Sequence, residues 1–168
     1  NEGYIEVESG PGQGTIFRIL WPATEDKPVT DKDVESKVTF VPRNETILCV
    51  EDDYNVRELM CGALKSLGYK IIEAENGRVA LEKVRKDFLW DKIDLVISDI
   101  IMPEMSGEDL AGELRKTRPE MKILLCSGFT DSRISLHDTY KEKGYHFLAK
   151  PYSLNKLEKT IRMILAEN

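Results

Sequence analysis

Short apolar runs alternate with amphipathic stretches over most of the chain, from residue 46 to the C-terminus. Such runs, bounded by turn residues, are typical of strands buried in a parallel sheet. The predicted strands are residues 47–50, 69–74, 94–99, 123–126 and 145–149. The second of them carries more polar residues than the others, so we expect it at an edge of the sheet.

The stretches between these runs predict helices. Apolar residues after the first strand recur at the spacing of one helical face, namely Val56, Leu59, Met60, Ala63, Leu64 and Leu67. Gly68 ends that helix, and an Asn-Gly pair introduces the next one. Ser106 and Ser153 are the expected N-caps of the third and the last helix. The fourth helix, predicted over 131–143, has only a poor apolar stripe.

Five strand-then-helix units joined by short loops predict a doubly wound α/β fold. Right-handed crossovers between such units give a parallel sheet with helices on both faces. In this architecture ligands bind at the carboxyl ends of the strands, where the strand order switches. The residues that directly follow the strands are therefore the first candidates for a functional site.

Residues 1–23 follow a different pattern, with two alternating segments around a glycine-rich loop from Gly10 to Gly14. They predict a β-hairpin, which by itself has nothing to pack against. The loop pattern alone favours a turn over a phosphate cradle, because an isolated Gly-x-Gly is a weak signal. Residues 24–45 mix charges, Pro and Thr without periodicity and are predicted to form a linker.

Composition narrows the functional classes. The 168-residue chain has 24 Lys and Arg against 30 Asp and Glu, a net charge of -6, which argues against binding to nucleic acid or to an anionic membrane. No apolar run approaches the length that crosses a bilayer, and no signal-peptide pattern is present. Cys49, Cys61 and Cys126 lack metal-ligand spacing, so we expect reduced, buried thiols and a cytoplasmic location.

Charged and hydroxyl side chains follow the predicted strands at one edge of the sheet. They are Glu51, Asp52 and Asp53 after the first strand, Asp99 after the third, Ser127 after the fourth and Lys150 after the fifth. Each of them alone fits a structural role, as a loop-capping Asp or a solvated surface Lys. Together, crowded carboxylates need a cation, and an all-oxygen set favours Mg²⁺. A metal beside a carboxylate, an ammonium group and a hydroxyl suits phosphoryl transfer to that carboxylate.

The segment from Thr46 to the C-terminus resembles the receiver domain of two-component response regulators. The matching motifs, in order, are residues 50–53, 98–107, 126–128 and 147–151. The resemblance implies a flavodoxin-like (βα)5 sheet with the strand order 2-1-3-4-5. It also implies a phosphoacceptor function that depends on Mg²⁺.

The resemblance assigns roles to individual residues. Asp99 corresponds to the phosphoacceptor, Lys150 to the phosphate partner, Ser127 to the switch hydroxyl and Phe147 to the switch aromatic residue. The protein ligands of Mg²⁺ correspond to Glu51, Asp52, Asp99 and the backbone carbonyl of Ile101. In this family the bond between the Lys and the following Pro151 is cis.

Two positions depart from the family pattern. Glu51 stands where Asp is commoner, so its reach to the metal is an open question, and the neighbouring Asp53 is expected to point away from the site. Phe147 stands where Tyr is frequent, so the switch would act by packing, without a phenol that hydrogen-bonds.

The N-terminal hairpin also carries a resemblance. Residues 9–17, followed by Leu20-Trp21-Pro22, resemble the last glycine box and final strand of the ATP-binding domain of sensor histidine kinases. The other motifs of that domain are absent, so we expect neither ATP binding nor kinase activity from this segment. The expected domains are a kinase remnant over 1–23, a linker over 24–45 and a receiver domain over 46–168.

The resulting hypothesis is the C-terminal receiver domain of a hybrid sensor histidine kinase. The phosphoryl group would come from a phosphohistidine of a kinase domain, in the same or a partner chain, and a downstream histidine phosphotransfer protein is a further expected partner. A homodimer through the fourth helix, fifth strand and fifth helix is an assembly that the resemblance allows. His137 and His146, the only histidines, fit structural roles better than a phosphodonor role.

Other functional classes fit the sequence less well. The alternative is an unphosphorylated receiver-like scaffold for protein interaction, which the presence of both Asp99 and Lys150 disfavours. A nucleotide-binding enzyme would need G-x-G-x-x-G after the first strand. An aspartyl phosphatase would need a second Asp where Ile101 stands.

Overall fold

The computed structural model describes residues 3–23, 43–86, 89–128, 140 and 142–167 of the chain. The chain divides into two units, Asn1–Val38 and Thr39–Asn168. Most of the fourth helix predicted over 131–143 and most of the predicted linker lie outside the described residues.

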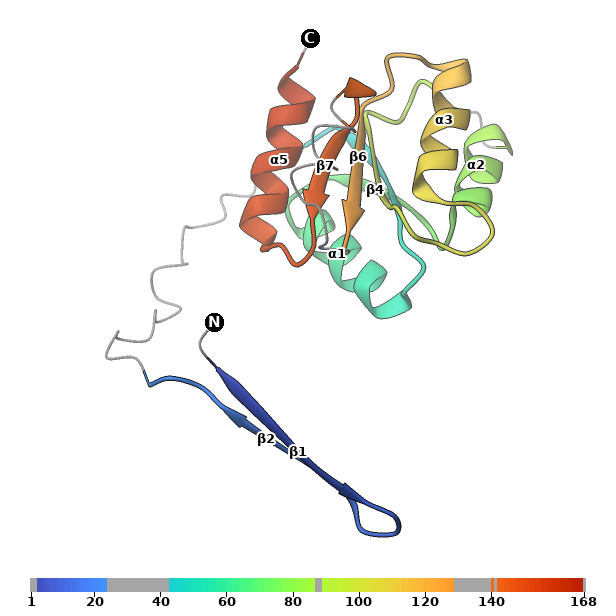
Figure 1. Ribbon diagram of the computed structural model, residues 1–168. Coiled ribbons are helices and arrows are strands. Elements are labelled where there is room, and N and C mark those ends of the chain that lie inside the picture. Colours follow the sequence, from blue (N-terminus) through green and yellow to red (C-terminus); the bar gives the residue numbers. More distant parts are fainter. Residues whose placement is uncertain (1–2, 24–42, 87–88, 129–139, 141, 168) are drawn as a thin grey trace. The chain divides into compact units, whose positions relative to one another are not determined.

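The N-terminal unit contains an antiparallel hairpin of β1 (Tyr4–Gly10) and β2 (Gly14–Leu20) (Figure 1). Gly12 and Gly14 in its loop have φ values of 73° and 78°, a conformation that glycine adopts without a Cβ clash. The apolar side chains of the hairpin are exposed, with Phe17 at 66%. The two strands and the turn were predicted from the sequence, and the described hairpin has no core of its own.

The second unit contains a five-stranded parallel sheet with the strand order β4-β3-β5-β6-β7. Its strands are β3 (Thr46–Val50), β4 (Lys70–Ala74), β5 (Leu95–Asp99), β6 (Ile123–Ser127) and β7 (His146–Ala149). Counted within this unit the order is 2-1-3-4-5, which confirms the predicted flavodoxin-like topology. The more polar second strand, β4, lies at an edge as expected.

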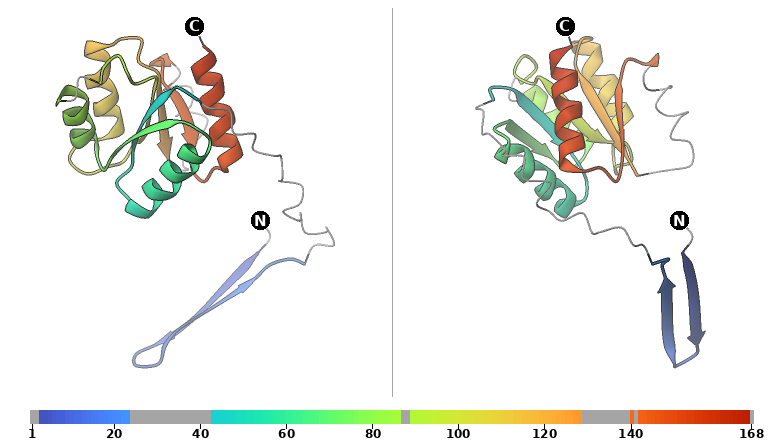
Figure 2. Two further views of the ribbon diagram at one scale, coloured as in Figure 1. Left: turned by 180° about the vertical axis from the view of Figure 1, so that it is seen from behind. Right: turned by 90° about the vertical axis from the view of Figure 1, so that its left-hand side faces the viewer.

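Helices cover both faces of this sheet (Figure 1, Figure 2). They are α1 (Tyr54–Ser66), α2 (Gly77–Lys86), α3 (Gly107–Thr117) and α5 (Leu154–Ala166). Successive strand residues point to opposite faces. Ile47 therefore packs in the cluster that contains α1 and α5, whereas Leu48 packs with α2 and α3. The sheet is thus a rigid platform with an apolar core on each side.

Other expectations about single residues are also met in this unit. Cys49, Cys61 and Cys126 are buried and free. Ser106 and Ser153 cap α3 and α5, accepting hydrogen bonds from backbone N–H groups at 3.1 Å and 3.2 Å. Among the helices that the structure describes, none is long and apolar enough to cross a membrane.

The apolar stripe predicted for α1 is only partly buried. Met60, Leu64 and Leu67 pack into the core, but Val56 is 40% exposed and Leu59 is 77% exposed. The apolar stripe is thus wider than the part of the helix surface that the core buries. A helix that lies on a sheet buries only the side chains nearest the sheet, so the outer margin of a wider apolar stripe stays in solvent.

Helix α3 begins in close contact with the end of β5. A Cβ on Gly107 would lie 2.1 Å from the carbonyl oxygen of Asp99 and 2.9 Å from Oγ of Ser98. The Gly107 N–H donates to the carbonyl oxygen of Ile100 at 3.0 Å. This approach, which a side chain would prevent, folds residues 100–106 back over the strand end.

Two glycines of α3 give a matched test of that contact. Gly107→Ala should destabilise the receiver unit by about 1–3 kcal/mol, because the methyl group overlaps the Asp99 carbonyl. Gly112→Ala, on the same helix with nothing within 4 Å of the new Cβ, should be neutral or stabilising by about 0.4–1 kcal/mol. Urea unfolding measures both. Equal stability of the two variants would contradict the close approach.

Candidate functional site

Three acidic residues follow β3, and they divide into two roles. Asp53 is the N-cap of α1, and its Oδ1 accepts from the N–H groups of Asn55 at 2.8 Å and Val56 at 3.0 Å. Its side chain is therefore committed to the helix, as expected for the acid that points away from the site. Glu51 and Asp52 are left to contribute their carboxylates at the strand end.

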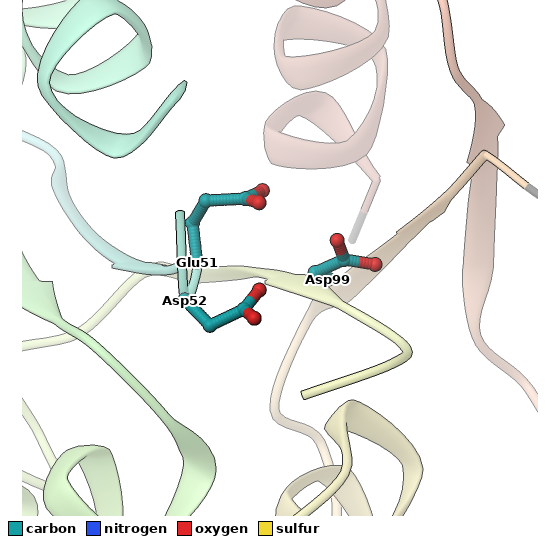
Figure 3. A group of neighbouring side chains, drawn as sticks. All are labelled: Glu51, Asp52 and Asp99. Carbon is teal, nitrogen blue, oxygen red and sulfur yellow. The ribbon is translucent and has the colours of Figure 1, made fainter. Parts of the chain in front are cut away.

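Asp99 is the last residue of β5, the strand next to β3. Its Oδ1 accepts a hydrogen bond from the N–H of Ile101 at 3.3 Å. The side chain is 16% exposed, so it is held at the surface of the strand end and remains reachable from solvent. Figure 3 shows the carboxylates of Glu51, Asp52 and Asp99 around one space at these two neighbouring strand ends.

Lys150, directly after β7, connects the two acidic strand ends. Its Nζ donates to Oε2 of Glu51 at 2.7 Å and to Oδ2 of Asp99 at 2.7 Å. The Lys150 N–H also donates to the carbonyl oxygen of Ser127 at 2.7 Å, which fixes its backbone beside β6. The Lys150-Pro151 bond is cis, as the family resemblance implied.

The pKa shifts of this cluster follow from burial and from the ion pairs. Burial raises the pKa of the Glu51 carboxyl, and the ammonium of Lys150 only partly offsets this. Burial would lower the pKa of Lys150, but the hydrogen bonds to Asp99 and Glu51 outweigh it, so this pKa is raised. The cation is thus held charged between two carboxylates, one of which has a side chain only 5% exposed.

The same carboxylates form a candidate metal centre. One oxygen from each of Glu51, Asp52 and Asp99 can be chosen so that all three lie within 4.8 Å of one another. The donors are all carboxylate oxygens, a set that suits a hard divalent cation. The predicted acidic ligands therefore come together, although Glu51 also pairs with Lys150. The carbonyl of Ile101 as a further ligand stays a prediction.

The two predicted switch residues lie on neighbouring strands. Ser127 ends β6 and is 4% exposed. Phe147, on β7, is partly buried and stacks on Tyr140, with ring centroids 5.6 Å apart. The sequence predicted Ser127 and Lys150 at the same edge of the sheet. It did not predict the contact between Phe147 and Tyr140, which are seven residues apart in the chain.

The loop between β5 and α3 is held by contacts that the sequence did not indicate. Glu104, with a φ of 65°, accepts from Nδ2 of Asn76 at 3.2 Å and from Nε of Arg78. Asn76 also caps α2, since its Oδ1 accepts from the N–H of Val79 at 2.9 Å. The loop that carries Ile101 is therefore tied to the start of α2. The sequence shows that these residues are charged or suited to cap a helix, but it does not show that they contact one another.

Comparisons with known proteins agree with this geometry. A family model described as the response regulator receiver domain matches residues 47–162. The sensor kinase CckA of Brucella abortus (strain 2308) is 37% identical over 170 residues, which cover 97% of this chain and 18% of that protein. The chain therefore spans less than a fifth of the length of that relative.

Solved structures show the same similarity. The receiver domain of the hybrid histidine kinase CckA aligns with a TM-score of 0.58 at 31% identity, covering 71% of this chain and 98% of that one. The response regulator protein TrrA of Thermotoga maritima, in complex with Mg²⁺-BeF, aligns with a TM-score of 0.59 at 35% identity, covering 71% of this chain and 98% of that one.

Removal of the bridging cation should make stability depend on pH. In Lys150→Met the pKa of Glu51, already raised by burial, rises further. Above pH 4.5, the ordinary pKa of a Glu carboxyl, the native state then binds more protons than the unfolded state. The free energy of unfolding should therefore fall as pH rises through the raised pKa. The raised pKa of Lys150 stabilises the native state at pH values below 10.5, the ordinary pKa of a lysine. Removal of the ammonium group therefore also lowers stability at both pH values of the test.

Urea unfolding without divalent cations, at about pH 5 and about pH 8, measures this effect. Lys143→Met is the matched control, because Lys143 pairs with Glu108 at 3.3 Å on the exposed surface. The control should lose little stability at either pH. The interpretation fails if the two variants show the same change between the two pH values.

Proposed function

The chain belongs to the family of response regulator receiver domains, and from that membership we propose that Asp99 is the residue that accepts the phosphoryl group in two-component signalling. One observation carries the assignment. Lys150 bridges Asp99 and Glu51 at 2.7 Å each, so the carboxylate at the end of β5 already lies beside a fixed cation. Among the carboxylates at this edge, Asp99 combines that contact with access from solvent.

In the proposed reaction an oxygen of Asp99 attacks the phosphorus of a phosphohistidine. The new P–O bond forms as the P–N bond breaks, and the imidazole leaves with the electron pair. The ammonium of Lys150 transfers its contact from the carboxylate to the phosphoryl oxygens and offsets their charge. The hydroxyl of Ser127 donates a hydrogen bond to one of these oxygens, and Phe147 repacks in response.

Magnesium is the proposed metal of the site. When bound, it would neutralise charge on the transferred group. Asp52 and Asp99, with the carbonyl of Ile101 and the longer side chain of Glu51, are the groups that would hold it. The all-oxygen donor set supports this, as does the Mg²⁺-BeF complex of the similar protein TrrA.

We place the donor protein on a groove between α1 and α5. This groove, of about 410 Å³, has an almost wholly apolar lining, including Val56, Leu59, Pro151 and Leu154. Val56 and Leu59 are the α1 residues that the core leaves exposed. Because Lys150 lines the same groove, a phosphohistidine-bearing helix seated there would bring its histidine close to Asp99.

The parent protein is proposed to be a hybrid sensor histidine kinase. The similarity to the sensor kinase CckA covers 97% of this chain and so includes the N-terminal hairpin as well as the receiver domain. On this proposal residues 1–23 close the ATP-binding domain, residues 24–45 are the linker and the receiver domain acts in the cytoplasm. The donor is then a kinase domain of the same or a partner chain, and a histidine phosphotransfer protein is a candidate recipient.

The first test replaces the proposed acceptor. Asp99→Ala should lose all phosphorylation by acetyl phosphate and all spectral response to beryllofluoride, both with Mg²⁺, because of the two carboxylates that contact Lys150, Asp99 is the one more accessible to solvent. Mass spectrometry and amide NMR measure the two responses. Asp53→Asn, which keeps the N-cap of α1, should respond like the wild type. A full response in Asp99→Ala would refute the assignment.

The second test addresses the donor groove. Leu59→Glu should slow phosphotransfer from a phosphohistidine-bearing kinase or phosphotransfer domain by about tenfold or more, because a charge would be buried at an apolar contact. Its reaction with acetyl phosphate should be unchanged. Met163→Glu, an equally polar change on α5 at a residue that is 55% exposed and outside the groove lining, is the control. Equal rates in both variants would contradict docking at this groove.

A further inference from the structure

An arginine of α1 hydrogen-bonds to the backbone of the loop that carries Glu51 and Asp52. Nη1 of Arg57 donates to the carbonyl oxygen of Glu51 at 2.5 Å and to that of Asp52 at 3.3 Å. Its guanidinium also lies 5.7 Å from the ring centroid of Tyr54. One side chain therefore contacts the backbone of both acidic residues at the end of β3, although nothing in the sequence pattern assigned it a role.

The helix fixes where this guanidinium can reach. The Arg57 N–H donates to the carbonyl oxygen of Asp53 at 2.9 Å in the first turn of α1, and the side chain of Asp53 caps the same turn. Helical side chains point back toward the N-terminus of their helix. The guanidinium is consequently directed at the loop that precedes α1, and the loop and the helix form one hydrogen-bonded unit.

Two consecutive carboxylates need such a constraint if both are to serve one site. In a continuing strand, successive side chains point to opposite faces, yet oxygens of Glu51 and Asp52 lie within 4.8 Å of each other and of an oxygen of Asp99. The chain must therefore turn after β3. The orientation of the peptide planes that follow Glu51 and Asp52 determines the direction of the Asp52 side chain, and Arg57 hydrogen-bonds to the carbonyl of each plane.

We propose that Arg57 is a positioning residue of the metal centre, which orients the Glu51–Asp52 backbone so that the carboxylates converge with Asp99. The inference rests on the proposed Mg²⁺ site. The side-chain hydrogen bonds that the structure describes for Arg57 go to backbone carbonyl oxygens and not to the carboxylates. Arg57 therefore leaves the proposed metal-binding oxygens available. This separates it from Lys150, which occupies carboxylate oxygens of the same cluster.

Charge and geometry predict opposite effects when Arg57 is replaced. A positive charge beside the cluster opposes binding of a divalent cation, so its loss alone would tighten Mg²⁺ binding. Loss of the oriented carbonyls would weaken binding, and loss of an outer contact of this kind costs about 10–100-fold in metal affinity. The sign of the change in the Mg²⁺ dissociation constant therefore identifies the role of the residue.

The experiment titrates MgCl₂ into the 168-residue chain and follows the amide NMR signals of Asp99 and Ile101. Arg57→Ala should raise the Mg²⁺ dissociation constant about tenfold. Arg57→Gln, neutral but still a donor, and Arg57→Lys, charged but without the planar fork, should give intermediate values. Lys65→Ala is the control, because it removes a charge from the same helix where Lys65 pairs with Glu73, far along α1 from the loop.

Urea unfolding without metal accompanies each titration. Equal losses of stability in Arg57→Ala and Arg57→Lys, with a larger rise of the Mg²⁺ dissociation constant in Arg57→Ala, would support positioning over a general effect on folding. An unchanged or lower dissociation constant in Arg57→Ala would overturn the inference while leaving the metal site intact. If the wild type shows no Mg²⁺ response, the proposed metal site itself fails. Should Arg57→Ala not fold, the Arg57→Gln and Arg57→Lys variants show whether the Mg²⁺ dissociation constant rises or falls.

Discussion

The contact between Lys150 and the carboxylates of Glu51 and Asp99 is the constraint on which the rest of the site depends. Carboxylates that share a space repel each other unless a cation lies between them, and here the ammonium lies 2.7 Å from each. The two acids come from the neighbouring central strands β3 and β5, while the lysine follows β7 at the far edge. The sheet must therefore hold three strand ends in register before this charge arrangement can exist.

The remainder of the receiver unit serves that requirement. Two apolar clusters, one on each face, clamp the sheet between helix pairs, and the loops beyond the strand ends are tied down individually. Arg57 holds the loop after β3, and Asn76 with Arg78 holds Glu104 in the loop after β5. The approach of Gly107 to the Asp99 carbonyl completes this arrangement. Loops held by such contacts suit the proposed site, in which small changes in position would decide the affinity for metal and phosphate.

Apolar side chains that the core leaves exposed form the surface proposed for docking of the donor protein. Val56 and Leu59 belong to the apolar stripe of α1, and the structure leaves both exposed in the groove that Lys150 also lines. Periodicity records that a helical face is apolar, but it does not say whether a sheet of the same chain or another protein covers it. In the same way the exposed apolar residues of the N-terminal hairpin support the proposal that these two strands close the ATP-binding domain of a kinase.

The sequence by itself determined the strands, the edge position of the second strand, the Ser106 and Ser153 caps and the chemistry at each strand end, because these follow from local pattern and from the polarity of a parallel sheet. Glu51, Asp52, Asp99, Ser127 and Lys150 could all be named in this way. Only the tertiary structure decided that Asp53 caps α1, that Glu51 pairs with Lys150, and that Arg57 and Glu104 hold the surrounding loops. Those contacts depend on side-chain directions and backbone turns between elements far apart in the chain, which spacing along a sequence does not encode.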